Sequence, residues 1–170
     1  MTESARLLRA NGGGRFGTQS DVRRFRTGRR LLEIHGEATV TSNEPAAVAT
    51  RFLEAFSKAD FEGMRAMLAG DLVAYITNAD GGMDQVEGRD TYLSRVEAMD
   101  LPSAQFSIEL TQPPVRVGSD QVLVMVEIRA QRGGRSLHNF AAHLLSIAAG
   151  RITEWRMVDA KPAESDEFWS

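Results

Sequence analysis

The feature that most constrains this chain is the stretch from residue 121 to residue 159, which predicts three consecutive β-strands. Residues 121–131 are dense in β-branched side chains, and residues 135–148 and 151–159 follow after short turns at Gly133-Gly134 and Gly150. Residues that favour a pleated surface, separated by glycine turns, are typical of an antiparallel meander. We therefore expect a long, curved sheet with one concave face that can hold a ligand.

The first 43 residues differ in composition from the rest of the chain. They contain a glycine triplet and an arginine cluster at residues 23–30, with few large apolar side chains before Leu31, so they can bury little surface. Eight arginines against four acidic residues give this segment a net charge of +4, whereas residues 44–170 carry −7. Three interpretations stay open: a basic arm for nucleic acid or an anionic surface, an arginine-rich targeting peptide, or an extension outside the domain that precedes a true start at Val40.

Residues 44–117 predict short helices that alternate with strands. Pro45 suits the first turn of a helix whose apolar residues recur at helical spacing, and Asp60 suits the N-cap of a second helix. Pro113 and Pro114 interrupt a later strand and indicate a sheet edge or a bulge. The expected elements are helices at 45–59, 61–70 and 89–101 and strands at 71–78, 84–87 and 103–117. We expect a basic, disordered extension at 1–43, one domain at 44–160, and a tail at 161–170 that packs on the domain or on a partner.

Composition excludes several classes of function. The chain has no cysteine, so disulfides, thiol catalysis and cysteine-ligated metals are excluded. No apolar run approaches the ~20 residues of a membrane span, and no secretory signal opens the chain, so a cytoplasmic protein is expected. The acidic charge of residues 44–170 argues against nucleic acid as a partner of the domain. There is no phosphate loop, dinucleotide fingerprint or nucleophile elbow, and the histidines lack zinc-site spacing, so we expect no cofactor and no metal.

Three local phrases carry a resemblance to a known family. They are FLEAF with ADF at residues 52–61, VEGRD at 86–90 and GRITEWR at 150–156. Their order and spacing resemble the SnoaL-like branch of the nuclear transport factor 2-like superfamily, which includes relatives of ketosteroid isomerase and of polyketide cyclases. The resemblance implies an α+β cone in which three N-terminal helices pack on a strongly curved, mostly antiparallel sheet. It also implies a deep, mostly apolar pocket, and an outer sheet face that pairs two chains.

The resemblance supplies a test for steroid-isomerase chemistry. Phe52, Ile76 and Ala142 fall where isomerases of this fold have a catalytic tyrosine, a general-base aspartate and a protonated aspartate. All three are apolar here, which argues against that mechanism. The resemblance implies instead that these side chains line the pocket.

The same alignment assigns the faces of the last two strands. Because alternate residues of a strand share a face, the side chains expected to point into the cone are His138, Phe140, Ala142, Leu144, Trp155, Met157 and Asp159. His138 and Asp159 are then the candidate acid–base pair. The alternative is that His138 lies in water at the open end of its strand and that Asp159 caps the chain before the tail. Tyr75 is expected at the pocket mouth or as a packing residue with a wet tip, and His143 is expected to face outward with Asn139.

These observations predict a homodimeric protein that binds a small, largely apolar organic molecule. The chemistry expected from the resemblance is isomerase-, cyclase- or hydratase-type acid–base catalysis without a cofactor. A non-catalytic ligand-binding or dimerisation module is the alternative, and an adaptor that binds nucleic acid through its basic arm is a third interpretation.

Overall fold

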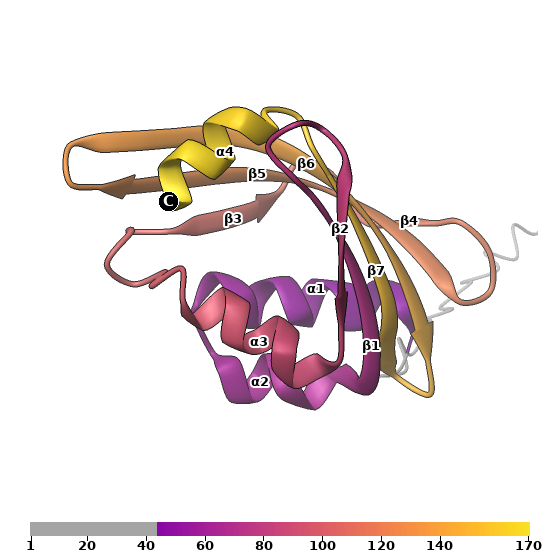
Figure 1. The fold of residues 1–170 in the computed structure, drawn as a ribbon. Coiled ribbons are helices and arrows are strands. Elements are labelled where there is room, and N and C mark those ends of the chain that lie inside the picture. The colour runs from indigo at the N-terminus through magenta and orange to yellow at the C-terminus, as the bar shows by residue number, and fades with distance from the viewer. Residues whose placement is uncertain (1–43) are drawn as a thin grey trace, which may run out of the picture. The chain divides into compact units, whose positions relative to one another are not determined.

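The computed structural model describes residues 44–170, in which seven strands form one sheet and four helices pack beside it (Figure 1). The strand order is β2-β1-β7-β6-β5-β3, and β4 pairs with β5. Every pairing is antiparallel except that of β1 with β7, which is parallel. The predicted α+β class with a strongly curved, mostly antiparallel sheet is confirmed. The predicted basic extension lies outside the described residues.

The meander is the longest part of the sheet. It consists of β5 (Gln121–Arg132), β6 (Arg135–Ala148) and β7 (Arg151–Asp159). Gly133 and Gly134 have φ angles of 58° and 78°, and Gly150 has a φ of 75°, in the left-handed region that glycine adopts without strain. The three predicted strands and both glycine turns are therefore confirmed.

A β-bulge interrupts the pairing of β6 with β7 close to their turn. Ile147 lies opposite Ile152, but Ser146 lies opposite Glu154, so β7 has one extra residue, Thr153. A single inserted residue exchanges the two faces of the strand beyond it. The bulge thereby decides which side chains of β6 share a face with the far half of β7.

The other strands flank the meander. β1 (Leu68–Thr77) begins earlier than predicted, directly after the second helix, and pairs with β2 (Met83–Glu87) on one side and β7 on the other. The prolines at 113–114 separate β3 (Ser107–Leu110) from β4 (Val115–Arg116), and β3 forms the edge of the sheet, as expected.

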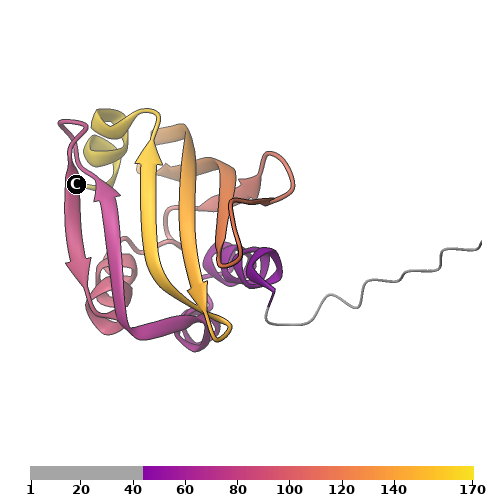
Figure 2. The same ribbon diagram turned by 90° about the vertical axis from the view of Figure 1, so that its right-hand side faces the viewer.

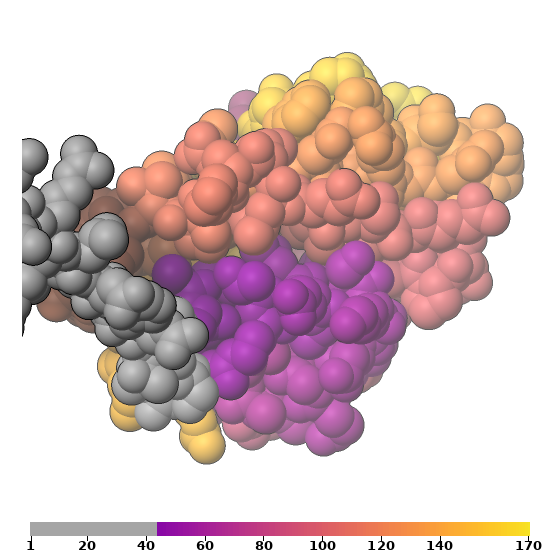
Figure 3. Space-filling view, turned by 180° about the vertical axis from the view of Figure 1, so that it is seen from behind, coloured from indigo at the N-terminus to yellow at the C-terminus, as the bar shows by residue number. Residues whose placement is uncertain are grey.

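Three of the helices pack against the concave face of the sheet, which leaves the opposite face of β1, β7 and β6 turned toward the viewer in Figure 2. They are α1 (Pro45–Ser57), α2 (Phe61–Met67) and α3 (Arg89–Glu97). The Asp60 carboxylate accepts a hydrogen bond from the amide of Gly63 at 2.9 Å, which confirms the predicted N-cap of α2. α1 also runs along the β3–β4 segment (Figure 3). Glu44 at the start of α1 pairs with Arg116 of β4 at 3.4 Å.

The fourth helix, α4 (Pro162–Trp169), was not predicted as a helix. Its Phe168 is buried in a small cluster with Ala104, Ala130 and Leu137. The guanidinium of Arg132 donates to the carbonyl of Phe168 at 3.3 Å, and that of Arg135 donates to the carbonyl of Glu167 at 2.8 Å. Cations at carbonyls of a last helical turn complement its dipole, so these contacts hold α4 across the open end of the sheet.

Among residues 44–170, no helix is both long and apolar enough to cross a lipid bilayer. The cytoplasmic location stays a prediction.

Candidate functional site

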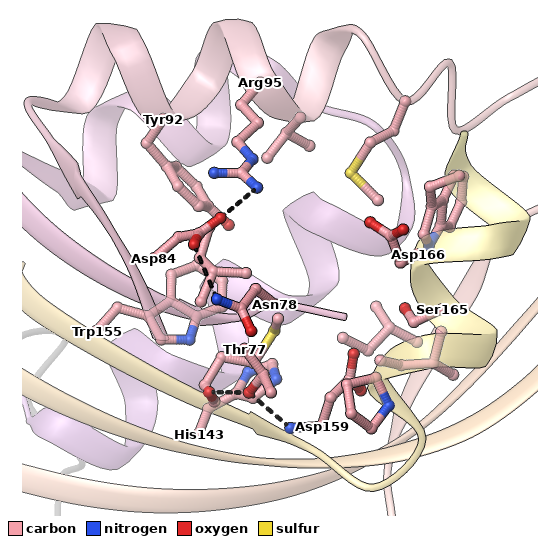
Figure 4. A pocket seen from close by; sticks show the side chains of 18 of the residues that line it. Thr77, Asn78, Asp84, Tyr92, Arg95, His143, Trp155, Asp159, Ser165 and Asp166 are labelled. Carbon is pink, nitrogen blue, oxygen red and sulfur yellow. Dashed lines mark hydrogen bonds and ion pairs between the residues drawn. The ribbon is translucent and has the colours of Figure 1, made fainter. Parts of the chain in front are cut away.

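A cavity of about 220 Å³ lies between the concave face of the sheet, α3 and α4 (Figure 4). Most of its wall is aromatic or aliphatic, with side chains from α1, α3, α4 and six strands. Apolar cavities of ~150 Å³ can bind benzene, so this one has room for a molecule of one or two rings. Its polar lining residues are Thr77, Asn78, Asp84, Arg95, His143, Asp159, Ser165 and Asp166.

Asp159 is the last residue of β7 and points into this cavity, as predicted from the alternation of the strand. The amide Nδ2 of Asn139 donates to its Oδ1 at 2.7 Å. Burial raises the pKa of the Asp159 carboxyl above its ordinary value of 3.8, and hydrogen bonds from Ser165 and Asn139 oppose that rise. Ser165 and Asn139, the two hydrogen-bond partners, are both uncharged. Asp159 is thus a partly desolvated carboxyl group held in one orientation.

Thr77 fixes the backbone on which Asp159 lies. Its hydroxyl Oγ1 donates to the carbonyl of Met157 at 2.8 Å and accepts from the amide of Asp159 at 3.1 Å. The parallel pairing of β1 with β7 has ended by then, at Tyr75 and Arg156. The threonine side chain therefore continues the link between the two strands at the point where Asp159 enters the cavity.

His143 lies in the middle of β6 and is only 2% exposed. Its side chain lines the cavity, on the same row of the sheet as Met157. Burial lowers the pKa of the imidazole from 6.5 to about 4, so the ring is neutral at pH 7. Neither ring nitrogen has a hydrogen-bond partner among residues 44–170.

Trp155 supplies a buried aromatic surface of the cavity. Its ring meets Phe52 edge-on at 5.0 Å between centroids and lies 5.2 Å from the rings of Tyr92 and His143. This packing immobilises the indole. Its Nε1 is buried and, within the described residues, has no hydrogen-bond partner.

A second polar group lies on the opposite wall, where β2 meets α3. The amide Nδ2 of Asn78 donates to Oδ1 of Asp84 at 3.1 Å, and Arg95 Nη2 contacts Asp84 Oδ2 at 3.4 Å (Figure 4). Asp166 of α4 lines the same cavity. The pocket is consequently apolar in its depth and charged near α3 and α4.

The structure places four of the predicted pocket residues together in the cavity: Ile76, Trp155, Met157 and Asp159. Phe52 is fully buried behind Trp155 and supports the pocket without lining it. Tyr75 faces the other side of β1, where the Arg156 guanidinium lies 4.2 Å from its ring centroid.

The predicted face of β6 is wrong. The side chains of His138, Phe140, Ala142 and Leu144 point away from the cavity, and the inner face carries Asn139 and His143 instead. The cause is the bulge near the β6–β7 turn: uninterrupted pairing from that turn would put Ala142 opposite Met157, whereas it lies opposite Val158. The His138–Asp159 pair is not formed.

His138 binds a different carboxylate, on the outer face of the sheet. Its Nε2 lies 2.6 Å from Oε1 of Glu127, which Arg129 also contacts at 2.6 Å. Sequence reasoning assigned His143 to this outer face and did not identify the pair at Asp84 and Arg95 as part of the site. The sequence near the β6–β7 turn shows Gly150 but nothing that indicates the bulge. Asp84 of β2, Arg95 of α3 and Asp166 of α4 belong to no sequence motif, so they could not be identified in advance.

Metal binding has no visible basis in the part of the chain that the structure describes. It contains no group of three or more histidine, aspartate or glutamate side chains arranged to hold a metal ion.

Comparison with known proteins supports the fold and gives the family. Residues 49–155 match the SnoaL-like domain. An uncharacterized protein of Mycobacterium tuberculosis is 24% identical over 132 residues, which cover 77% of this chain and all of that protein.

Two solved structures are similar over most of the domain. The protein Bal32a, from a soil-derived mobile gene cassette, aligns with a TM-score of 0.66 at 17% identity and covers 76% of this chain and 98% of its own. An LEH-like epoxide hydrolase of M. tuberculosis aligns with a TM-score of 0.58 at 22% identity, over 68% of this chain and 82% of its own. At these identities the likeness establishes the fold alone. Because the matched region spans more than half of the chain and contains the whole meander up to Trp155, the protein belongs to the SnoaL-like domain family.

Proposed function

We propose that this protein binds a small, largely apolar organic molecule in the cavity and moves a proton on it with the Asp159 carboxyl group. One observation carries the proposal: Asp159 lies in an apolar pocket with a raised pKa and uncharged hydrogen-bond partners. A carboxyl with a raised pKa is a stronger base than an ordinary one and can return the proton that it accepts, which is what general acid–base catalysis requires.

The surroundings of Asp159 suit this role. Asn139 fixes one carboxylate oxygen at 2.7 Å, and Thr77 fixes the backbone that carries it. The apolar side chains of the wall lower the local polarity and so strengthen any interaction between the carboxyl and a bound molecule. Isomerisation, cyclisation and hydration all include a proton transfer of this kind, and the epoxide hydrolase with the same fold is named for a related reaction.

The test compares two acid–base reactions on the full-length protein. One is the exchange of the α-protons of α-tetralone in deuterated water, followed by proton NMR, and the other is the hydrolysis of styrene oxide. Wild-type protein should accelerate at least one of them above the buffer rate. Asp159→Asn should reduce that acceleration by 10²-fold or more, since the amide cannot take up the proton.

Asp166→Asn is the matched control, because Asp166 is a second carboxylate that lines the cavity but lies on α4. Its activity should stay within a few-fold of wild type. Equal losses in both variants would assign the effect to net charge and contradict the role given to Asp159.

A non-catalytic binding module is the second candidate. It is favoured by the apolar residues Phe52 and Ile76, which stand where the resemblance places two isomerase catalytic groups. Saturable binding of α-tetralone with no acceleration of either reaction would support this candidate over the catalytic one.

We further propose that two copies pair through the outer face of the sheet. Met125, Ala142 and Val158 form one row across β5, β6 and β7, and Phe140 lies beside it. The side chains of Met125, Phe140 and Val158 are 42%, 45% and 55% exposed, which is an unusual cluster of large apolar groups on a monomer surface.

Val158→Lys should shift the protein from dimer to monomer in sedimentation equilibrium. Val117→Lys, at an equally exposed valine near β4, should leave the mass unchanged; a monomeric wild type would refute the pairing.

A further inference from the structure

A second hollow adjoins the cavity between the ends of α3 and α4. It has a volume of about 220 Å³, and its lining residues are Arg95, Ala98, Met99, Asp166, Trp169 and Ser170. Those that also line the cavity are Arg95, Met99, Asp166 and Trp169. These shared residues, which we call the neck, form the border between the two spaces.

The spacing of residues along the two helices explains why the spaces adjoin. On α3, Tyr92 lines the cavity alone and Ala98 lines the hollow alone. On α4, Ser165 lines the cavity alone and Ser170 lines the hollow alone. Residues three or four apart lie side by side on a helix, so the neck residues between these positions belong to both rows. The hollow is therefore a continuation of the helix faces that cover the cavity.

Arg132 of β5 fixes the distance between the two helices at the neck. Its Nη1 donates to the carbonyl of Met99 at 3.3 Å, and its Nη2 donates to the carbonyl of Phe168 at 3.3 Å. The same guanidinium lies 5.8 Å from the ring centroid of Trp169. One planar group thus ties the end of α3 to the end of α4, so the gap between them has a set width.

The neck offers hydrogen-bonding groups that a ligand can reach. The side chain of Arg95 is 50% exposed, and its Nη2 contacts Asp84 Oδ2 at 3.4 Å. A guanidinium has five N–H donors, so this contact leaves others available. The carboxylate of Asp166, on the α4 side, has no hydrogen-bond or ion-pair partner in the part of the chain that the structure describes.

The opposite charges of the neck narrow the chemistry of the group that binds there. An ammonium group would be attracted by Asp166 and repelled by Arg95, and a carboxylate would meet the reverse. A hydroxyl group is uncharged and both donates and accepts, so it can donate to Asp166 and accept from Arg95. The wall of the cavity, in contrast, is mostly apolar and suits a ring.

We propose that the binding site extends through the neck into the hollow, and that its ligand is an elongated, uncharged molecule with a ring at one end and a hydroxyl group at the other. This inference rests on the proposed function and specifies its substrate class. Six residues separate Tyr92 from Ala98, which corresponds to roughly 9 Å along α3. A ring that carries a four-carbon chain and a hydroxyl group has about this length. The ring end then lies in the cavity with Asp159.

The test uses phenylalkanol probes and NMR of the full-length protein. 4-Phenyl-1-butanol should show nuclear Overhauser effects from its ring to the methyl group of Met157, which lines the cavity. The CH₂ group beside its hydroxyl should show them to the methyl group of Ala98, which lines the hollow. 2-Phenylethanol has a chain two carbons shorter and should reach Met157 without reaching Ala98.

Dissociation constants from the same titrations give the energetic arm. For each chain length, the constant of the hydrocarbon is divided by that of the alcohol. The ratio for butylbenzene and 4-phenyl-1-butanol should exceed the ratio for ethylbenzene and 2-phenylethanol by about tenfold, the value of one hydrogen bond. Both ratios contain the cost of removing a hydroxyl group from water, so this cost cancels.

A substitution that fills the hollow adds a second readout. Ala98 is exposed at the end of α3, and Ala98→Phe should weaken the binding of 4-phenyl-1-butanol about tenfold while leaving that of α-tetralone unchanged. Glu97→Phe is the matched control, because it places the same side chain at a neighbouring exposed position that lines neither space. Both ligands should bind this control as they bind wild type.

Each other outcome has a distinct meaning. If α-tetralone binds but 4-phenyl-1-butanol makes no contact with Ala98, the extension into the hollow is wrong while ligand binding in the cavity stands. Tighter binding of 4-phenylbutyrate or 4-phenylbutylamine than of the alcohol would overturn the uncharged ligand class. If no probe binds, both the extension and the proposed function are overturned.

Discussion

Acid should destabilise this protein through His143, because the imidazole is buried and, among residues 44–170, neither of its ring nitrogens has a hydrogen-bond partner. In the unfolded chain the ring takes up a proton near its ordinary pKa of 6.5, whereas burial lowers the pKa of the folded state to about 4. Between these values the unfolded state binds more protons than the folded state. Stability therefore falls as the pH drops through this window and recovers above it.

The magnitude follows from the size of the shift. Each unit of pKa difference corresponds to ~1.4 kcal/mol, so the change from 6.5 to about 4 amounts to about 3 kcal/mol lost between pH 7 and pH 4. That is a large part of the ~5–15 kcal/mol that stabilises an ordinary domain. Asp159 acts with the opposite sign: burial raises its pKa, so this group adds stability as the pH falls toward its ordinary value of 3.8.

The assay is urea denaturation of wild type and His143→Leu at pH 7 and at pH 4, followed by tryptophan fluorescence. Leucine takes up no proton, so the variant should lose about 3 kcal/mol less than wild type over this interval. The difference between the two proteins cancels the contributions of Asp159 and the other carboxyl groups. The control variant His138→Gln keeps the buried ring of His143, so its loss of unfolding free energy between pH 7 and pH 4 should equal that of wild type.

Identical pH dependence of wild type and His143→Leu would refute the reasoning. It would mean that the folded state protonates His143 as readily as the unfolded chain, through water or an acidic partner at the ring.

Three further substitutions test the elements that position the site. Thr77→Val removes both hydrogen bonds that tie β1 to the end of β7 and should lower the free energy of unfolding in urea by about 1–3 kcal/mol. A smaller loss would show that the two strands stay together without the threonine hydroxyl. Asp60→Ala removes the hydrogen bond to the Gly63 amide and should cost ~1 kcal/mol, so an unchanged midpoint would contradict the capping role. Phe168→Ala should cost up to ~3–5 kcal/mol in thermal unfolding, while Glu167→Ala beside it should be nearly neutral; equal effects would contradict the burial of α4 against the sheet.

Much of the fold could be predicted from the sequence because the strongest signals were local. The glycine turns of the meander, the proline break between β3 and β4, and the Asp60 cap each depend on a few adjacent residues. Their order then matched one family, which supplied the curvature of the sheet.

The faces of the strands could be predicted only where no bulge intervened. Trp155, Met157 and Asp159 were placed correctly because they alternate on β7 beyond the bulge. The residues of β6 were placed wrongly because one extra residue in β7 shifts the register, and a shift of one exchanges both faces. Threonine is common in regular strands, so the presence of Thr153 does not indicate a bulge at this position.

The remaining site residues depend on tertiary packing. Asp84 and Arg95 are eleven positions apart and meet because β2 returns along β1 before α3 folds over it. Asp166 enters the cavity because α4 docks on β6, an arrangement set by Phe168 and two arginines far away in sequence. No spacing along the chain signals such contacts.

The central claim is that a small uncharged molecule binds on the inner face of the sheet. Nuclear Overhauser effects between α-tetralone and the protein's methyl groups test it most directly, because Met157 lines the cavity and its neighbour Val158 lies on the outer face. The account predicts contacts from the probe to the methyls of Met157 and Ile76 and none to Val158. Contacts to Val158 and Met125 with none to Met157 would contradict it, since the ligand would then lie on the outside of the sheet.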